Sequence, residues 1–299
     1  MNLEQWRREG NTFEWQGQRI FYRDQGRGEV LLCLHGFPTA SWDWHRLWPA
    51  LITTRRVIAL DFLGYGFSSK PLDHAYSAVE QADIVLALMQ SLGIGQAHVL
   101  AHDFGDSVAQ ELLARVAERG AGLPLKLLSV CYLNGGLFME AARPRLIQRL
   151  LLGPLGPWLS QRLSYPRFAR SFAAIFGPHT QPSARELDDF WRLIASDNGH
   201  HLAHALIQYI PERHRQRARW VAAMQNSKVP QCLIIGMADP VSGWRIAKRY
   251  RELLPAADVV ELPGIGHYPQ VEAADAVLVA YASFIARVAN APGEGFKAP

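Results

Sequence analysis

Continuous apolar runs that alternate with helical segments constrain the fold of this chain more than any other feature. The runs are "EVLLCLHG", "RRVIALDFLGYG", "AHVLAHDFG", "LKLLSVCYLNGG" and "QCLIIGMADP". Such runs are typical of strands that are covered on both faces, as in a parallel sheet. Helices are predicted between them, for example at residues 77–92 and 104–119. The alternation predicts a parallel sheet flanked by helices, preceded by a hairpin that turns at Gly17.

The alternation is interrupted once, from about Leu137 to about Gln231. The interrupting segment is predicted to be mostly helical, with breaks at "GPLGPW", "FGPHTQPS" and "SDNGHH". We therefore expect a core formed by residues 1–136 and 223–290, a helical cap at residues 137–222, and a disordered tail at residues 291–299. A chain of 299 residues with 49% hydrophobic residues is long enough to bury such a core.

The charge of the chain is concentrated in the predicted cap. The net charge is +4, and residues 137–222 contain twelve arginines, no lysine and six acidic residues. This pattern is more typical of a solvated helical face than of a binding patch, although an anionic substrate or an acidic membrane surface remains an alternative. The sequence contains none of the common nucleic-acid-binding motifs, so no nucleic-acid partner is expected.

Compartment and redox state follow from other features. Cys33, Cys131 and Cys232 each lie in a short apolar run and are predicted to be buried, unpaired hydrophobic residues. The N-terminal "MNLEQWRREGNT" lacks the apolar region of a secretory signal. No apolar run approaches the roughly 18 residues of a membrane span. We expect a soluble, cytoplasmic protein.

Asp103 is placed where one predicted strand ends and a helix begins. Its neighbours at −2 and +2 are Ala101 and Gly105, so the strand and the helix can approach closely. This is the pattern of the nucleophile elbow, here with a carboxylate in place of the usual serine hydroxyl. The following helix N-terminus favours a negative charge. On this stretch alone, an Asp103 that only caps the helix is an equally good interpretation.

Two further loops favour the interpretation of Asp103 as a nucleophile over that of a helix cap. His267 lies in a Gly-rich loop before the last long helix, and Asp239 follows the run "CLIIG". Alone, either residue has a common structural explanation, since aspartates before proline are frequent in turns. Together they give the chain order nucleophile, acid, base that is typical of α/β-hydrolases. In this arrangement the backbone N–H groups of Phe104 and of Phe37, in the early loop "HGFP", would form the oxyanion hole.

With these motifs, the chain resembles the α/β-hydrolase superfamily, in particular the branch of epoxide hydrolases and haloalkane dehalogenases that uses an aspartate nucleophile. "HGFPT", "ALDFLGYGFSSKP", "AHDFGD" and "GIGHYPQVE" carry the resemblance. "HGFPTASWDW", "VIALDFLGYGFSSKP", "GDSVAQELL", "LNGG" and "LIQYI" are most similar to the mesoderm-specific-transcript-like hydrolases.

The resemblance implies a fold, a mechanism and a partner. The fold would be a mostly parallel eight-stranded sheet with a helical cap, without cofactor or metal. Asp103 would attack an electrophilic carbon of a small apolar substrate to form an alkyl-enzyme ester. His267, oriented by Asp239, would then activate the water that hydrolyses the ester. The oligomeric state does not follow from the sequence.

An epoxide hydrolase needs an acid that protonates the opening ring. A tyrosine O–H is suitable, and Tyr165 and Tyr209 in the predicted cap are the candidates, with Tyr209 preferred. A buried aromatic residue with a satisfied hydroxyl is an equally good interpretation of either. His35 and Trp191 complete the predicted substrate-binding set.

A haloalkane dehalogenase is the alternative enzyme, but it needs N–H donors for the leaving halide. Members of that family usually have tryptophan directly after the nucleophile and often asparagine in the early loop, where this chain has Phe104 and Phe37. Trp158, Trp191 or Trp220 would have to supply a donor, and core packing is the more common role for each.

Two residues near the predicted site depart from the expected pattern. Asp106 occupies a position of the elbow where a small residue is usual, and it could crowd the turn or perturb neighbouring pKa values. Asn134 follows the run "VCYL" at a place that some dehalogenases use for the acid, but an amide supplies no charge, so Asp239 is retained.

A non-hydrolytic interpretation comes from "RLIQRLLLGPLGPWLSQRL" in the predicted cap. This Arg-rich amphipathic stretch is compatible with a membrane-associated or binding protein that retains the fold. More often such a stretch is a lid over a pocket, so membrane association is not expected.

Epoxide hydrolysis to a diol is the leading prediction.

Overall fold

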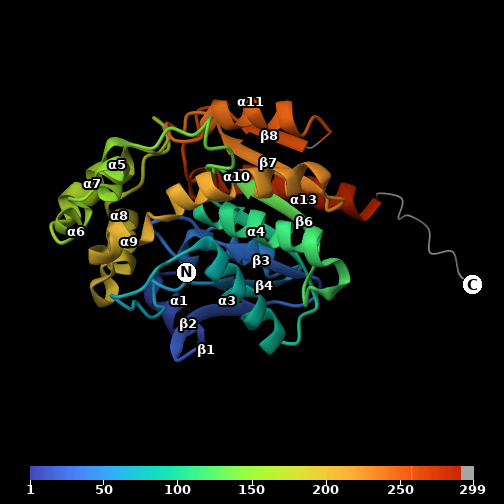
Figure 1. The fold of residues 1–299 in the computed structure, drawn as a ribbon, viewed down its shortest axis with the longest axis horizontal. Helices are drawn as coiled ribbons and strands as arrows, with labels where there is room; N and C mark the ends of the chain where they lie inside the picture. Colours follow the sequence, from blue (N-terminus) through green and yellow to red (C-terminus); the bar gives the residue numbers. More distant parts are fainter. Residues whose placement is uncertain (257, 291–299) are drawn as a thin grey trace, which may run out of the picture.

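The computed structural model describes residues 1–256 and 258–290, so the predicted tail at residues 291–299 lies outside the described part of the chain. The elements form one eight-stranded sheet with helices on both faces (Figure 1). The strands are β1 Asn11–Trp15, β2 Gln18–Gln25, β3 Val30–Leu34, β4 Arg56–Leu60, β5 Gln96–His102, β6 Lys126–Leu133, β7 Gln231–Gly236 and β8 Asp258–Leu262. The α-helices are α1 Leu3–Arg8, α2 Trp48–Leu51, α3 Ala78–Ser91, α4 Phe104–Arg119, α5 Leu146–Leu152, α6 Gly156–Ser160, α7 Tyr165–Ala173, α8 Ala184–Ala195, α9 Ala203–Leu206, α10 Tyr209–Asn226, α11 Gly243–Leu253, α12 Pro269–Glu272 and α13 Ala274–Asn290.

The strand order confirms the predicted mostly parallel sheet. Strands follow one another across the sheet as β1-β2-β4-β3-β5-β6-β7-β8. Only β1 with β2 and β2 with β4 pair antiparallel, and the remaining neighbours are parallel. The expected hairpin is present, with Trp15 opposite Gln18 and both turn residues, Gln16 and Gly17, at positive φ.

Both faces of the sheet are buried, as the continuous apolar runs predict. Along β3, Leu32 and Leu34 belong to one apolar cluster, whereas Leu31 and Cys33 belong to the other. Helices α3, α4, α10 and α11 contribute to the first cluster, and α2, α12 and α13 contribute to the second. The three cysteines are buried and unpaired, as predicted.

The helices on either side of β5 match the sequence expectation closely. Helix α3 begins after Ser77, whose hydroxyl accepts a hydrogen bond from the backbone N–H of Glu80 at 3.1 Å. Helix α4 spans the predicted residues 104–119. Helix α10 packs along α4, and the predicted boundary between residues 222 and 223 falls inside α10.

Helices α5 to α9 lie together to one side of the sheet (Figure 1). The segment between α7 and α8 is tied to the loop before α12, because the backbone N–H of His267 donates to the Ile175 carbonyl at 2.8 Å. Phe172 and Phe176 pack on the Tyr268 ring at centroid distances of 4.9 and 5.3 Å. None of the helices in the described residues is both long and apolar enough to cross a membrane.

Candidate active site

The sharp turn predicted at Asp103 is present between β5 and α4. Asp103 has φ 46° and ψ −102°, a strained conformation for a residue with a Cβ atom. The turn requires glycine two residues later, since a Cβ atom at Gly105 would lie 2.3 Å from the Leu34 carbonyl oxygen. The Asp103 side chain makes no capping hydrogen bond to α4, so the interpretation of Asp103 as a simple helix cap is wrong.

The Asp103 carboxylate is held by groups from two other parts of the chain. The backbone N–H of Phe37, in the loop after β3, donates to Oδ2 at 3.1 Å. Arg213 of α10 donates from Nη2 to the Asp103 carbonyl at 2.6 Å, and the same nitrogen lies 3.5 Å from Oδ1. Ser107 fixes this guanidinium by accepting from its Nε at 2.6 Å. A buried carboxylate thus faces one N–H donor and one cation.

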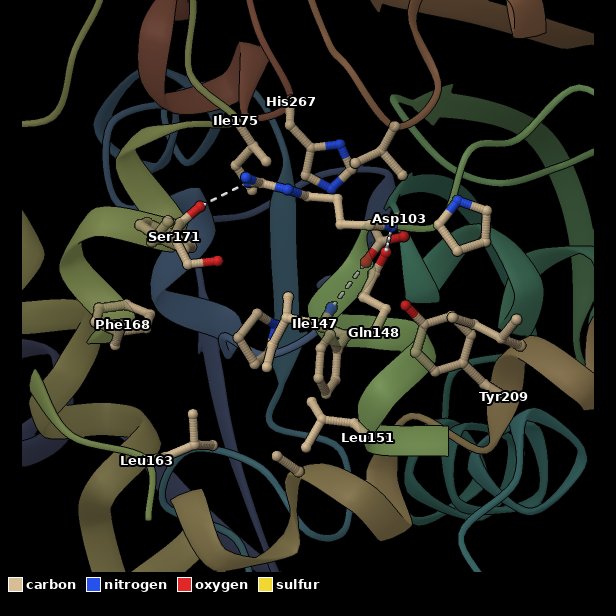
Figure 2. A pocket seen from close by; sticks show the side chains of 18 of the residues that line it. Asp103, Ile147, Gln148, Leu151, Leu163, Phe168, Ser171, Ile175, Tyr209 and His267 are labelled. Carbon is tan, nitrogen blue, oxygen red and sulfur yellow. Dashed lines mark hydrogen bonds between the residues drawn. The ribbon is translucent and has the colours of Figure 1, made fainter. Parts of the chain in front are cut away.

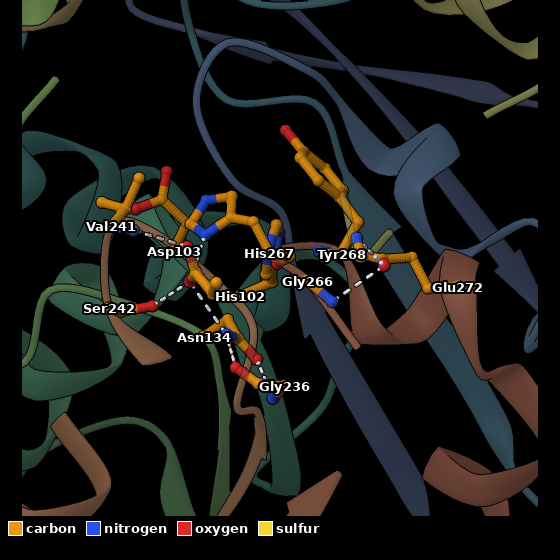
Figure 3. Close-up of polar contacts among 12 residues, drawn as sticks. His102, Asp103, Asn134, Gly236, Val241, Ser242, Gly266, His267, Tyr268 and Glu272 are labelled. Atoms are coloured by element: carbon orange, nitrogen blue, oxygen red, sulfur yellow. Dashed lines mark hydrogen bonds and ion pairs between the residues drawn. The ribbon is translucent and has the colours of Figure 1, made fainter. Parts of the chain in front are cut away.

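His267 and Asp239 form the second part of the site. Figure 3 shows His267 with the neighbouring Asn134 and Ser242. His267 Nδ1 donates to Asp239 Oδ2 at 2.8 Å. The amide of Asn134 donates to the same oxygen at 2.8 Å, and the Ser242 hydroxyl also donates to it. Oδ1 of Asp239 accepts the backbone N–H of Val241 at 2.7 Å. Asn134 therefore orients the acid rather than replacing it.

Burial and charge act against each other in this pair. Burial alone would lower the pKa of His267, but the charges of Asp239 and Asp103 and the hydrogen bond to Asp239 raise it to about 9. Burial alone would raise the pKa of Asp239, but the imidazolium and the hydrogen bonds from His267, Ser242 and Asn134 lower it to about 2. At neutral pH the resting pair is an imidazolium and a carboxylate.

The loop that carries His267 is braced by Glu272 of α12. One Glu272 oxygen accepts the backbone N–H of Gly266 at 2.8 Å, and the other accepts the N–H of Tyr268 at 2.9 Å. At the end of β5, His102 Nε2 donates a hydrogen bond to the His267 carbonyl at 2.9 Å. These contacts fix the loop on which the imidazole stands.

A cavity of about 320 Å³ opens in front of Asp103 and His267 (Figure 2). Most of its remaining lining is apolar and comes from α5 to α10, with Ile147, Leu151 and Phe168 as examples. The site therefore offers a carboxylate and an imidazole to a largely apolar ligand.

Tyr209 lines this cavity from the first turn of α10, as preferred from the sequence. Its hydroxyl makes no hydrogen bond to any residue in the described ranges, and its ring lies 4.5 Å from the Arg213 guanidinium carbon. Burial and the charge of Asp103 raise the pKa of Tyr209, and Arg213 opposes them. A protonated phenol with a cation against its ring is thus available to a ligand.

Other predicted site residues have different outcomes. His35 does not line the cavity. Its Nε2 accepts a hydrogen bond from the Phe62 N–H at 3.0 Å, and its Nδ1 donates to the Gly36 carbonyl at 2.9 Å. Both ring nitrogens are therefore bonded to the backbone. Tyr165 also lies outside the cavity lining, and its ring packs against Trp191. Trp191 itself does line the cavity. Of the predicted substrate-binding residues, Tyr209 and Trp191 therefore line the cavity, and His35 and Tyr165 do not.

The remaining tryptophans cannot serve a ligand in this cavity. Trp158 is 52% exposed on α6, and the buried Trp220 donates its indole N–H to Glu111 at 2.8 Å. Neither lines the cavity. Phe104 packs its ring on Tyr209 at 4.9 Å, so only its backbone N–H is relevant to chemistry.

Asp106 does not disturb the turn, because a distant glycine makes room for it. A Cβ atom at Gly135 would lie 2.1 Å from an Asp106 carboxyl oxygen. Neither carboxyl oxygen has a hydrogen-bond partner among the described residues. Burial raises the pKa of Asp106 well above its ordinary value, with the charge of Arg213 opposing the rise and the charge of Asp103 adding to it.

Arg213 is the site residue that sequence reasoning missed. It lies in the arginine-rich stretch "PERHRQRARW", which was interpreted as a solvated face. Tyr209, Arg213 and Trp220 recur at helical spacing and are all buried, and this periodicity was the available signal. Gly136 gives the guanidinium space, since a Cβ atom there would lie 2.5 Å from its Nη1.

Known proteins match this chain over most of its length. A family model described as "alpha/beta hydrolase fold" matches residues 29–274. The human mesoderm-specific transcript homolog protein is 43% identical over 294 residues, covering 95% of this chain and 88% of that protein. LipZ of Mycobacterium tuberculosis is 39% identical over 285 residues, covering 95% of this chain and 98% of LipZ.

Among solved structures, a haloalkane dehalogenase loop variant, DbeA-M1 from Bradyrhizobium elkanii, superimposes with a TM-score of 0.78 at 23% identity. It covers 94% of this chain and 97% of the dehalogenase. At this identity the likeness establishes the fold alone.

Proposed function

The chain belongs to the α/β-hydrolase family, among the mesoderm-specific-transcript-like hydrolases, and we propose that it hydrolyses small apolar epoxides to diols through an ester on Asp103. The observation that carries the proposal is the shared cavity of Asp103, His267 and Tyr209, with Asp239 bonded behind the imidazole. A carboxylate on the elbow acts as a nucleophile without a base, because it needs no deprotonation at neutral pH.

In the first step, an Asp103 carboxyl oxygen attacks one epoxide carbon and the ring C–O bond breaks. The electron pair of that bond stays on the ring oxygen, which takes the proton of the Tyr209 hydroxyl. The product is a hydroxyalkyl ester of Asp103 and a phenolate. Arg213 supports this assignment, because its guanidinium lies against the Tyr209 ring and stabilises the phenolate charge.

Arg213 also orients the nucleophile. It anchors the Asp103 carbonyl at 2.6 Å, while the Phe37 N–H holds Oδ2 at 3.1 Å. Oδ1, which lies 3.5 Å from the guanidinium, is the less firmly bonded oxygen and is the better placed of the two to attack.

In the second step, a water molecule attacks the ester carbonyl carbon and gives a proton to His267. The N–H groups of Phe37 and Phe104 stabilise the oxyanion of the tetrahedral intermediate. Its collapse breaks the bond between the carbonyl carbon and the alkyl oxygen, which takes the proton from the His267 imidazolium and leaves as the diol. The remaining carboxyl group of Asp103 gives its proton to the Tyr209 phenolate in the same cavity, so Asp103 and Tyr209 are restored and His267 is again a neutral imidazole. Esterification removes the negative charge of Asp103, and this lowers the pKa of His267 at the stage where a neutral imidazole is needed.

Haloalkane hydrolysis is the second candidate, because Trp191 lines the cavity and carries an indole N–H that a halide can accept. The phenylalanine side chains of residues 37 and 104 offer no further donor to a leaving halide. A tyrosine and an arginine suit an oxygen leaving group better, since both stabilise an alkoxide.

A panel of terminal epoxides and matched chloro- and bromoalkanes tests whether the substrate is an epoxide or a haloalkane. We expect diol formation without halide release, abolished in Asp103→Asn. Halide release at a comparable rate would instead support the dehalogenase.

A single turnover in oxygen-18 water tests the ester step. The first diol should contain no label, because its new oxygen comes from Asp103, and label should enter the diol in later turnovers. Label in the first diol would contradict attack by the carboxylate.

A further inference from the structure

Helices α5 and α6 expose a concentration of large apolar side chains. Leu146 is 72% exposed, Leu150 42%, Leu155 59% and Trp158 52%. Half of the large hydrophobic side chains that are exposed in the described residues thus lie within this short stretch. We call these four residues the α5–α6 apolar surface. Isolated exposed apolar residues need no explanation, but a cluster of this kind marks an interaction site.

Helix α5 is apolar on two adjacent faces, which lie about 100° apart around its axis. Ile147 and Leu151, four residues apart, line the active-site cavity. Leu146 and Leu150, also four residues apart, face away from it. Ile147 and Leu151 on the inner face are apolar because they cover the apolar cavity. Leu146 and Leu150 on the outer face do not line the cavity, so we infer that they contact a partner outside the chain.

The arginines around this surface are without carboxylate partners. Residues 141–185 contain seven arginines, no lysine and no acidic residue. In the described part of the chain, none of the ion pairs involves an arginine of α5, α6 or α7, and Arg149, Arg162, Arg167 and Arg170 are exposed.

Arginines elsewhere in residues 137–222 do form ion pairs with carboxylates. Arg217 pairs with Glu140 and Arg219 pairs with Glu118, both at 2.5 Å. The unpaired arginines are therefore a property of the α5–α7 segment and not of the whole insertion. A surface that combines leucine, tryptophan and unneutralised arginine matches the anionic interface of a lipid bilayer.

The mouth of the cavity opens on the same side. Arg162 and Arg167 line the cavity and are also exposed, so the opening lies beside them. Arg162 stacks on Trp158 of the apolar surface, with the guanidinium carbon 4.0 Å from the ring centroid. The entrance and the α5–α6 apolar surface are thus adjacent.

We propose that the α5–α6 apolar surface docks on an anionic lipid bilayer, with the leucines and Trp158 in the interface and the surrounding arginines at the phosphates. Docking in this orientation turns the cavity mouth toward the membrane. An apolar substrate then enters from the bilayer, and only this last consequence rests on the proposed function.

Vesicle flotation of the full chain carrying Asp103→Asn tests docking without any turnover. The vesicles are pure phosphatidylcholine or a mixture with phosphatidylglycerol. The test variant is Leu146→Ser/Leu150→Ser/Trp158→Ser, none of which lines the cavity. The matched control is Leu72→Ser, which alters a 73% exposed leucine elsewhere. Far-UV circular dichroism and the melting temperature establish that each variant is folded.

We expect binding to the anionic vesicles that falls at least about tenfold in the triple variant and is unchanged in the control. Arg149→Gln/Arg170→Gln and added salt should weaken it as well. Equal binding of the parent and the triple variant would overturn the proposal. So would a concentration-dependent dimer in light scattering that the triple variant abolishes, since the occupant would then be a second copy of the chain.

Discussion

Replacing Asp103 by asparagine isolates the charge that the proposed ester removes. The amide keeps the shape of the carboxylate and, like the ester, is neutral. In the intact site the pKa of His267 is about 9 against an ordinary value of 6.5, a gap worth about 3 kcal/mol. Burial opposes this rise, and Asp239 contributes more to it than Asp103. We expect Asp103→Asn to lower the pKa of His267 by about one unit, or about 1.4 kcal/mol.

The sign of this shift matters for the mechanism. A raised pKa keeps the imidazole protonated below about pH 9 in the resting protein, and a protonated imidazole cannot take a proton from water. Loss of the Asp103 charge brings the titration closer to neutral pH, so that a larger fraction of His267 is a base once the ester exists.

A pH titration of the imidazole ¹⁵N signals between about pH 5 and 10 measures the shift. Asp106→Asn is the matched control, because it makes the same carboxyl-to-amide change at a buried position next to the elbow that does not line the cavity. An unchanged or higher pKa in Asp103→Asn, or an equal fall in Asp106→Asn, would refute the assignment of charge around His267.

Three further changes test other parts of the site. Tyr209→Phe should reduce epoxide turnover by about 10²-fold or more, since the ring oxygen loses its proton donor; turnover within a factor of about two of the parent would exclude Tyr209 as that acid. Asn134→Ala should lower the free energy of unfolding by about 2 kcal/mol and reduce kcat more than KM, because Asp239 loses a donor; urea unfolding and steady-state kinetics measure both. Gly105→Ala should destabilise the fold by about 3 kcal/mol or more, because its Cβ atom meets the Leu34 carbonyl, whereas Gly95→Ala, with open space around it, should not; equal melting temperatures would contradict the steric argument.

Much of the fold could be predicted because its signals are local. Each core strand is a continuous apolar run, and the alternation of Leu31 to Leu34 between two apolar clusters explains why both faces had to be apolar. The elbow at Asp103 was visible because it depends on small residues two positions away on either side. The order of Asp103, Asp239 and His267 then predicted which loops meet at one end of the sheet, and the structure brings their side chains together there.

The contributions that depend on packing could not be predicted in the same way. Helical spacing from Tyr209 indicates that Arg213 is buried, unlike the exposed Arg215, but no local pattern indicates that Arg213 contacts Asp103. The accommodation of Asp106 depends on Gly135, which lies after another strand. His35 belongs to a motif near the site, yet its two nitrogens bond to the backbone of its own loop and the next. Proximity in a motif did not imply contact with the cavity.

The central proposal is a covalent bond between the substrate and Asp103, and trapping that bond tests it most directly. His267→Gln removes the base but leaves the nucleophile, so the ester should accumulate when the variant is mixed with a reactive epoxide. We expect the intact protein mass to rise by one substrate molecule, with the added mass located on the peptide that contains Asp103. An unmodified protein that still forms diol, or an adduct on any other residue, would contradict the proposal.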